Sequence, residues 1–237
     1  MNQSEPRSAA SGAASVSIAS KTETQSRIQM NPSPVRTVSL GQDRGLTWIE
    51  RVISWLSNRQ IRAAVKTFAG LSVADIGCGY NAEFARSVIG QAKSITITDL
   101  SIAPELKSAP SVRVIEGRLP GSLVSIDDAS VDVVICNSVI EHLDQPLETL
   151  SELYRICAFG GVVLINVPSW FGKTVLELMA YRLKMGPINE VEDHKMYFDP
   201  RDLWPLLIRS GFRPGEIRAF RHKFLCCTFA ICRKRAA

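Results

Sequence analysis

The most constraining feature of this 237-residue chain is a short apolar run that ends in a glycine-rich turn. Residues 71–76 are mostly apolar, as in a buried strand, and they end in Asp75-Ile76-Gly77-Cys78-Gly79. A helical pattern begins directly afterwards. Glycines at such a turn let the backbone approach a ligand, and the first N–H groups of the helix point toward it. The chain is therefore predicted to be an α/β protein with a ligand site at this turn.

Strand and helix signals alternate regularly after the turn. Short apolar runs predict strands at residues 71–76, 95–98, 112–115, 131–136 and 161–167, with helical patterns over 81–90 and 147–157. Two final runs, 215–220 and 224–232, flank a short polar link and predict an antiparallel hairpin. We therefore expect a Rossmann-like, doubly wound α/β fold with a seven-stranded sheet, mostly parallel with an antiparallel C-terminal strand.

Two acidic residues flank the turn and narrow the choice of ligand. Gly77-x-Gly79-x-x-Ala82 also fits a dinucleotide fingerprint, and Asp99, at the end of the next strand, suits a ribose hydroxyl of either cofactor. A dinucleotide would bring a pyrophosphate that Asp75 repels, whereas S-adenosylmethionine brings a sulfonium and an ammonium that a carboxylate attracts. Asp75 therefore favours S-adenosylmethionine, and capping of the loop's own N–H groups is its structural alternative.

Three further segments share a family pattern. These are Asp128–Leu143, Arg155–Gly161 followed by Asn166-Val167-Pro168, and the stretch from His194 through Tyr197-Phe198 to Gly211-Phe212. With them, the chain from residue 71 onward resembles the class I S-adenosylmethionine-dependent methyltransferases. It is most similar to the group that holds methyltransferase type 11 proteins, ubiquinone-biosynthesis O-methyltransferases and many small-molecule or glycan methyltransferases.

The resemblance implies further cofactor contacts beyond Asp75, Gly77, Gly79 and Asp99. Asn137 and Ser138 would lie beside the methionine moiety, and Arg118 and Leu119 near the adenine. Family members often carry an acidic residue after the third-strand glycine, where this chain has Arg118. Adenine contact is therefore expected from the Arg118 backbone or from Leu119 packing on the ring.

The chain is expected to divide into three parts. Residues 1–40 are rich in Ser, Ala, Thr and Gln and are predicted to be a flexible N-terminal tail. Residues 41–70 are predicted to be an N-terminal helical segment, and 71–237 the methyltransferase domain. Within that domain, 170–198 is the expected substrate cap, with Trp170, Tyr181 and Tyr197 as candidate substrate contacts, although aromatics at helical spacing are often core residues.

Histidine is the natural base for an oxygen acceptor. His142 follows the fourth strand and is the candidate base, with packing at a helix start as its alternative. His194 is a weaker candidate in a polar loop, and His222 is expected to be only solvated. Glu141 beside His142 suggests a divalent metal, but adjacent residues diverge on a helix and no third ligand stands out. No metal is therefore predicted.

The charge distribution and the cysteines limit which ligands and partners the sequence suggests. Residues 201–237 carry nine Lys and Arg against two Asp and Glu, so an anionic acceptor is conceivable, although a solvated rim is the simpler interpretation. The pattern of a nucleic-acid module is absent, and no apolar window is long enough to be a transmembrane segment. The six cysteines lack metal-ligand spacing and fit a cytoplasmic protein. The sequence does not indicate an oligomeric state.

The sequence thus favours S-adenosylmethionine-dependent methyl transfer to a small molecule or glycan, most simply at oxygen. Methylation at nitrogen or carbon is the first alternative. A dinucleotide-dependent oxidoreductase is a second, against which Asp75 and the terminal hairpin count, and a non-catalytic cofactor-binding module is a third.

Overall fold

A computed structural model describes Met1 and residues 38–42, 47–182 and 193–235. The chain divides into a unit Met1–Pro32, of which only Met1 is described, and a unit Ser33–Ala237 that holds the fold. Residues 2–37 of the predicted tail and residues 183–192 of the predicted cap lie outside the described residues.

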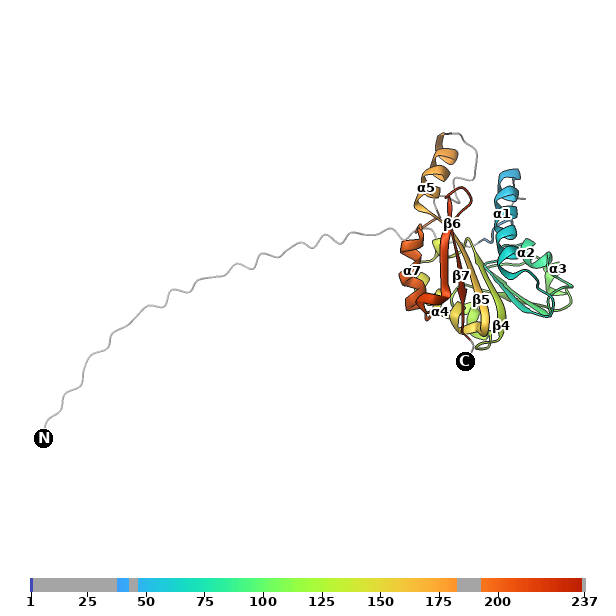
Figure 1. The fold of residues 1–237 in the computed structure, drawn as a ribbon, viewed down its shortest axis with the longest axis horizontal. Helices are drawn as coiled ribbons and strands as arrows, with labels where there is room; N and C mark the ends of the chain where they lie inside the picture. The colour runs from blue at the N-terminus through green and yellow to red at the C-terminus, as the bar shows by residue number, and fades with distance from the viewer. Residues whose placement is uncertain (2–37, 43–46, 183–192, 236–237) are drawn as a thin grey trace. The chain divides into compact units, whose positions relative to one another are not determined.

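One seven-stranded sheet organises the second unit, in the order β3-β2-β1-β4-β5-β7-β6 (Figure 1). The strands are β1 Ser72–Ile76, β2 Ser94–Asp99, β3 Val112–Glu116, β4 Val131–Asn137, β5 Cys157–Pro168, β6 Ile217–His222 and β7 Cys227–Arg233. The first five are parallel, and β7 pairs antiparallel with both β5 and β6. The predicted α/β class, strand number and antiparallel C-terminal strand are confirmed.

Helices cover both faces of this sheet (Figure 1). They are α1 Trp48–Val65, α2 Glu83–Arg86, α3 Pro104–Lys107, α4 Pro146–Ile156, α5 Trp170–Glu177 and α7 Pro200–Arg209. Successive residues of a strand point to opposite faces, so Val134 packs in the core under α4 and α7 while Ile135 packs in the core under α1, α2 and α3. A strand covered on both faces is mostly apolar, as β4 is apart from Asp132 and Asn137, and this is why β4 was recognisable in the sequence.

Two helices differ in length from the sequence prediction. The helical segment predicted at 41–70 contains one helix, α1, which begins at a capping box between Thr47 and Glu50. The helix predicted over 81–90 is only the single turn of α2, because Ala82 is left-handed and the chain leaves the helix at Ser87. The glycine turn therefore leads into a very short helix.

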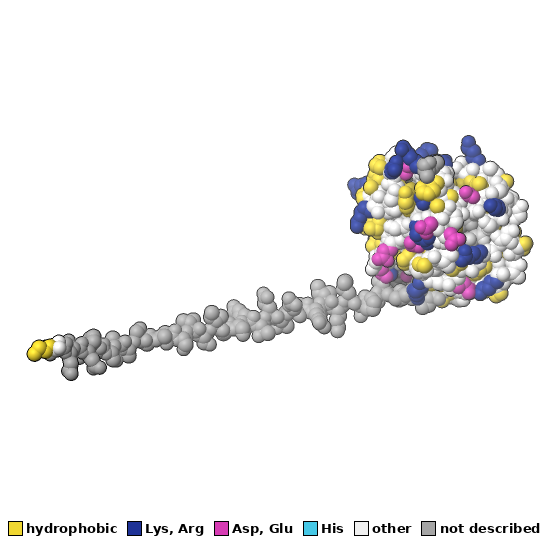
Figure 2. Space-filling model, turned by 90° about the horizontal axis from the view of Figure 1, so that it is seen from below, with side chains coloured by type: hydrophobic (Ala, Val, Ile, Leu, Met, Phe, Trp, Pro, Cys, Tyr) yellow, Lys and Arg dark blue, Asp and Glu magenta, His cyan; other side chains and the backbone are white. Residues whose placement is uncertain are grey.

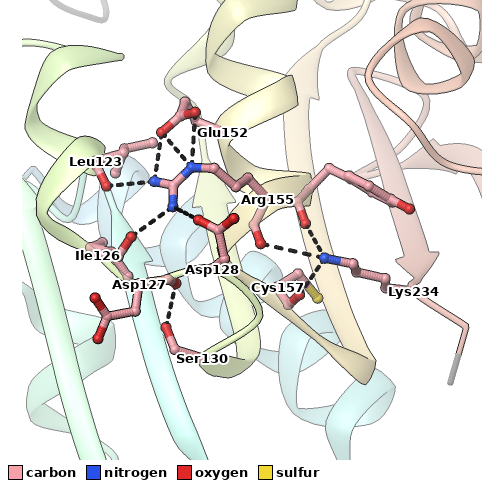
Figure 3. A network of polar contacts seen from close by, with 10 residues as sticks. Leu123, Ile126, Asp127, Asp128, Ser130, Glu152, Arg155, Cys157 and Lys234 are labelled. Atoms are coloured by element: carbon pink, nitrogen blue, oxygen red, sulfur yellow. Dashed lines mark hydrogen bonds and ion pairs between the residues drawn. The ribbon is translucent and has the colours of Figure 1, made fainter. Parts of the chain in front are cut away.

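Two basic side chains hold the C-terminal end of α4 (Figure 3). Arg155 donates to the carbonyls of Leu123 and Ile126 at 2.9 and 2.8 Å and pairs with Asp128 at 2.5 Å. Lys234 donates to the carbonyls of Tyr154 and Cys157, both at 2.9 Å. Cations at a helix C-terminus satisfy its last carbonyls and its dipole. The network joins α4 to the connection before β4 and to the end of β7.

Several basic side chains of the C-terminal stretch form ion pairs within the fold. Arg221 pairs with Asp199 at 2.9 Å, and Arg235 with Glu216 at 3.2 Å. The face in Figure 2 carries basic and acidic side chains side by side.

In the part of the chain that the structure describes, no helix has both the length and the apolar character to cross a membrane.

Replacing Gly172 with alanine is expected to destabilise the fold. Gly172 lies in α5 against the β6–β7 turn, and a Cβ there would lie 2.0 Å from the carbonyl oxygen of Cys226. Overpacking of this kind costs roughly 1–3 kcal/mol, so the midpoint of urea unfolding should fall clearly. Gly215→Ala is the control, because its Cβ would meet nothing within 4 Å. Equal midpoints for the two variants would contradict the close packing of α5 on the turn.

Candidate functional site

A cavity of about 1100 Å³ opens at the carboxyl ends of β1, β2 and β4. Asp75 lies near the end of β1, and Asn137 ends β4, the two strands between which the order of the sheet reverses. Ligands of open α/β sheets bind at this switch point. All the predicted cofactor residues line the cavity: Asp75, Gly77, Gly79, Asp99, Arg118, Leu119, Asn137 and Ser138.

The glycine turn has a backbone that other residues would strain. Gly77 and Gly79 have φ of 69° and 73°. A Cβ on Gly77 would lie 2.3 Å from Cγ2 of Val139, and one on Gly79 would lie 3.2 Å from the carbonyl oxygen of Leu40. Both the left-handed conformation and the lack of space therefore require glycine at Gly77.

Asp75 is a buried carboxyl group in the wall of this cavity. Its side chain is 4% exposed, and burial raises its pKa to about 7, with the charge of Asp99 adding to the rise. A hydrogen bond from the backbone of Ala85 opposes that rise. The backbone partner of Asp75 thus lies in α2 rather than in the glycine loop, and Asp75 also faces the cavity, where an ionised carboxylate favours a cation beside it.

Asp99 accepts hydrogen bonds from three directions. Its carboxylate takes the N–H of Gly79 at 2.8 Å, the N–H of Leu100 at 2.7 Å and the hydroxyl of Ser39. Ser39 is 3% exposed, and the neighbouring carbonyl of Leu40 accepts from the Tyr80 N–H at 2.9 Å. The end of the segment predicted as tail therefore packs on the glycine turn. Its Ser- and Thr-rich composition gave no signal for this contact.

The rest of the cavity wall comes from the end of β4 and from the residues that follow β4 and β3. Asn137 accepts from the side-chain amide of Asn166 at 3.0 Å, and Ser138 takes a left-handed conformation with φ of 59°. Glu116 is turned away, since it binds the Ile102 N–H and Lys107, both at 2.8 Å. Arg118 and Leu119, the residues expected near the adenine, line the cavity.

The structure brings His142 and His194 together at the same cavity. Their ring centroids are 4.8 Å apart, and the Asp193 carboxylate lies 2.9 Å from Nδ1 of His142. The contact arises because the N–H groups of residues 195 and 196 donate to the carbonyl of Glu141 at 2.8 and 3.2 Å. Glu141, His142 and His194 offer ligand atoms within 4.8 Å of one another. The third potential metal ligand that the sequence did not reveal is therefore His194.

The aromatic residues expected to contact substrate do not line the cavity. Trp170 and Tyr181 are each 50% exposed, and Tyr197 is buried beside His194, whose Nδ1 lies 3.2 Å from its hydroxyl. Burial raises the pKa of Tyr197 to about 12, so this hydroxyl stays protonated. The cap instead presents Leu176 and Met179 to the cavity. Helical spacing predicted the helix but not which face points inward.

The expectation that His222 is only solvated is also wrong. His222 is the last residue of β6, is partly buried, and has its Nε2 3.3 Å from the carbonyl of Leu56. Burial lowers its pKa.

Comparison with known proteins agrees with this geometry. Residues 49–216 match the family described as a methyltransferase domain. The chain is 33% identical over 103 residues to a probable S-adenosylmethionine-dependent methyltransferase of Mycolicibacterium smegmatis, covering 43% of this chain and 39% of that protein. It is 22% identical over 190 residues to a ubiquinone biosynthesis O-methyltransferase of Psychrobacter arcticus, covering 73% and 71%. The match thus spans less than half of the first of these two relatives.

Solved structures share the fold. A S-adenosylmethionine-dependent methyltransferase from Archaeoglobus fulgidus superposes with a TM-score of 0.55 at 17% identity, over 79% of this chain and 100% of that one. A Burkholderia thailandensis N1-methyltransferase of 1,6-didemethyltoxoflavin, solved with S-adenosylhomocysteine, gives 0.57 at 17% identity, over 79% and 80%.

Proposed function

Because the chain belongs to the class I S-adenosylmethionine-dependent methyltransferases, we propose that it transfers the methyl group of this cofactor to a hydroxyl oxygen of a small molecule or glycan. The observation that supports oxygen as the acceptor atom is the His142–Asp193 pair in the wall of the cavity. Nδ1 of His142 also lies 3.3 Å from the backbone carbonyl of Asp193, and acceptors at Nδ1 leave Nε2 as the basic nitrogen. An alcohol or phenol needs such a base, whereas a neutral amine does not.

The described residues fit the cofactor. Asp75 supplies negative charge for its sulfonium and ammonium, and Asp99 supplies acceptors for its ribose hydroxyls. The tight backbone at Gly77 and Gly79 admits a ligand close to the main chain. When bound, the cofactor supplies an already activated methyl group. The protein then has to align the acceptor and exclude water, for which Leu176 and Met179 provide apolar wall.

An anionic group on the acceptor is part of the proposal. Lys223, in the turn between β6 and β7, lines the cavity and is only 8% exposed. Burial lowers its pKa. The negative charge of Glu141 opposes that shift, because a buried lysine favours an anion beside it. Lys223 is a better candidate for such a contact than the exposed basic residues of the C-terminal stretch.

The proposal is tested by calorimetric titration with S-adenosylhomocysteine and, in parallel, with NADH. We expect the first to bind and Asp75→Ala to weaken it strongly. Binding of NADH instead would favour an oxidoreductase and refute the charge argument for Asp75. Hydroxylated, amine and carbon acceptors are then screened by release of S-adenosylhomocysteine. Turnover only on an amine or a carbon acceptor would overturn O-methylation, and binding without any turnover would favour a non-catalytic module.

Cofactor affinity should increase with pH through the titration of Asp75. The pKa near 7 means that the carboxyl group is mostly neutral at pH 5.5 and mostly ionised at pH 7.5. Since the ionised form attracts the cationic cofactor, the dissociation constant of S-adenosylmethionine should fall as pH rises across this interval. Asp75→Asn cannot ionise and should bind weakly with no such trend. A wild-type dissociation constant that stays constant from pH 5.5 to 7.5 would contradict the role of Asp75.

A further inference from the structure

Three side chains that suit a metal ion meet at the cavity. Glu141 and His142 follow β4, and His194 comes from the segment that pairs with the Glu141 carbonyl. All three line the cavity, together with Asn137 and Ser138 at the end of β4. One carboxylate and two imidazoles form a ligand set that binds divalent transition metals and leaves coordination positions open.

The surroundings hold these side chains in the manner of a metal site. Glu141 is completely buried, and its charge acts on the nearby Lys223, so a metal ion bound here would be a second cation beside this carboxylate. Nδ1 of His142 lies 2.9 Å from the Asp193 carboxylate, and Nδ1 of His194 lies 3.2 Å from the Tyr197 hydroxyl. An outer partner on one ring nitrogen is what orients metal-binding histidines and assigns the other nitrogen to the ion.

We propose that Glu141, His142 and His194 bind one divalent transition-metal ion on the acceptor side of the cavity. Bonds of about 2.0–2.2 Å place two ligands roughly 3.5 Å apart in a tetrahedral site, and about 4.3 Å apart only when they lie on opposite sides of the ion. The ligand atoms here lie within 4.8 Å of one another, so the most widely separated pair must approach by up to about 1.3 Å in a tetrahedral site. Both histidines are only partly buried, so rotation of their rings can bring these atoms closer together.

This inference rests on the proposed function and refines one step of it. A hydroxyl oxygen bound to a divalent ion would have a lowered pKa and would release its proton to solvent water before methyl transfer. His142 would then be a ligand of that ion rather than the group that takes the proton. If no metal binds, His142 remains the proposed base that takes the proton, and the proposal of methyl transfer is unchanged.

The test is titration of the purified full-length protein with Co²⁺, followed by visible absorption and calorimetry. Co²⁺ is chosen because its spectrum separates nitrogen and oxygen ligands from thiolates, and the chain has six free cysteines. We expect one equivalent to bind without a thiolate band. Glu141→Gln and His194→Ala should each lose at least tenfold in affinity, and Asp193→Asn should lose roughly tenfold, as an outer partner does, with the spectrum retained.

His222→Ala is the matched control, a histidine outside the cluster that should bind Co²⁺ as the wild type does. Each variant is also titrated with S-adenosylhomocysteine, which should bind normally and shows that the variant is folded. The inference is overturned if the wild type binds S-adenosylhomocysteine but not Co²⁺, or if Glu141→Gln and His194→Ala bind Co²⁺ like the wild type. Failure of S-adenosylhomocysteine to bind the wild type would refute the proposed function itself.

Discussion

Asp99→Ala is expected to weaken the binding of S-adenosylhomocysteine about a hundredfold. Two hydrogen bonds from ribose hydroxyls to a carboxylate contribute roughly 1.5 kcal/mol each, and 1.4 kcal/mol corresponds to a factor of ten. The carboxylate lies at the end of β2, in the cavity wall, with its position fixed by the N–H groups of Gly79 and Leu100. Calorimetry measures the change, and an unaltered dissociation constant would contradict ribose binding at Asp99.

The loss must be separated from loosening of the glycine turn, because Asp99 also holds the Gly79 N–H. An analogue of S-adenosylhomocysteine that lacks both ribose hydroxyls makes this separation. With that analogue, wild type and Asp99→Ala should differ little if the hydroxyls are the partners. A hundredfold difference that persists with the analogue would assign the effect to the turn.

Ser39 offers a second control on the same carboxylate. Its hydroxyl donates to Asp99 and accepts the Ser101 N–H at 2.8 Å, so it competes for one acceptor that a ribose needs. Ser39→Ala should therefore keep or raise the affinity for S-adenosylhomocysteine. A fall in affinity would place Ser39 among the groups that hold the cofactor.

The central sheet was predictable because each buried strand carries its own signal. β4 and β5 are covered on both faces, and this demands continuous apolar runs that can be read without knowing the fold. The glycine turn was equally clear, since Gly77 is required by a left-handed backbone and by the approach of Val139. Local chemistry of this kind leaves a local pattern in the sequence.

Contacts between distant segments left no such pattern. Ser39 meets Asp99 across 60 residues, and its hydroxyl fits the site although its neighbours have the composition of a flexible tail. His194 reaches His142 only because the backbone after it hydrogen-bonds to Glu141. The prediction for residues 170–198 was incomplete for another reason. Periodicity predicted the helix, but it did not show that Met179, in the helical turn Leu178–Arg182 after α5, lines the cavity whereas Trp170 does not.

His142→Ala should lower the rate of methyl transfer by about 10²–10⁴ while leaving the affinity for S-adenosylhomocysteine unchanged. A positioned acid–base group contributes a factor of this size to the rate. If His142 is instead a ligand of an activating metal ion, its loss should lower the rate by a similar factor. The cofactor is expected at residues that include Asp75, Asp99 and Asn137 but not His142, so binding and turnover should separate. The measurement is single-turnover formation of S-adenosylhomocysteine on the acceptor found by screening.

His222→Ala is the control for loss of a histidine, and Asp193→Asn probes orientation alone. His222 lies on β6 against α1 and should keep full activity. Asp193→Asn retains the imidazole but removes the charge that holds Nδ1, so its rate should fall less than that of His142→Ala. Full activity of His142→Ala on the same acceptor would exclude both roles considered for this side chain. The acceptor would then need no deprotonation, which is the behaviour expected of an amine.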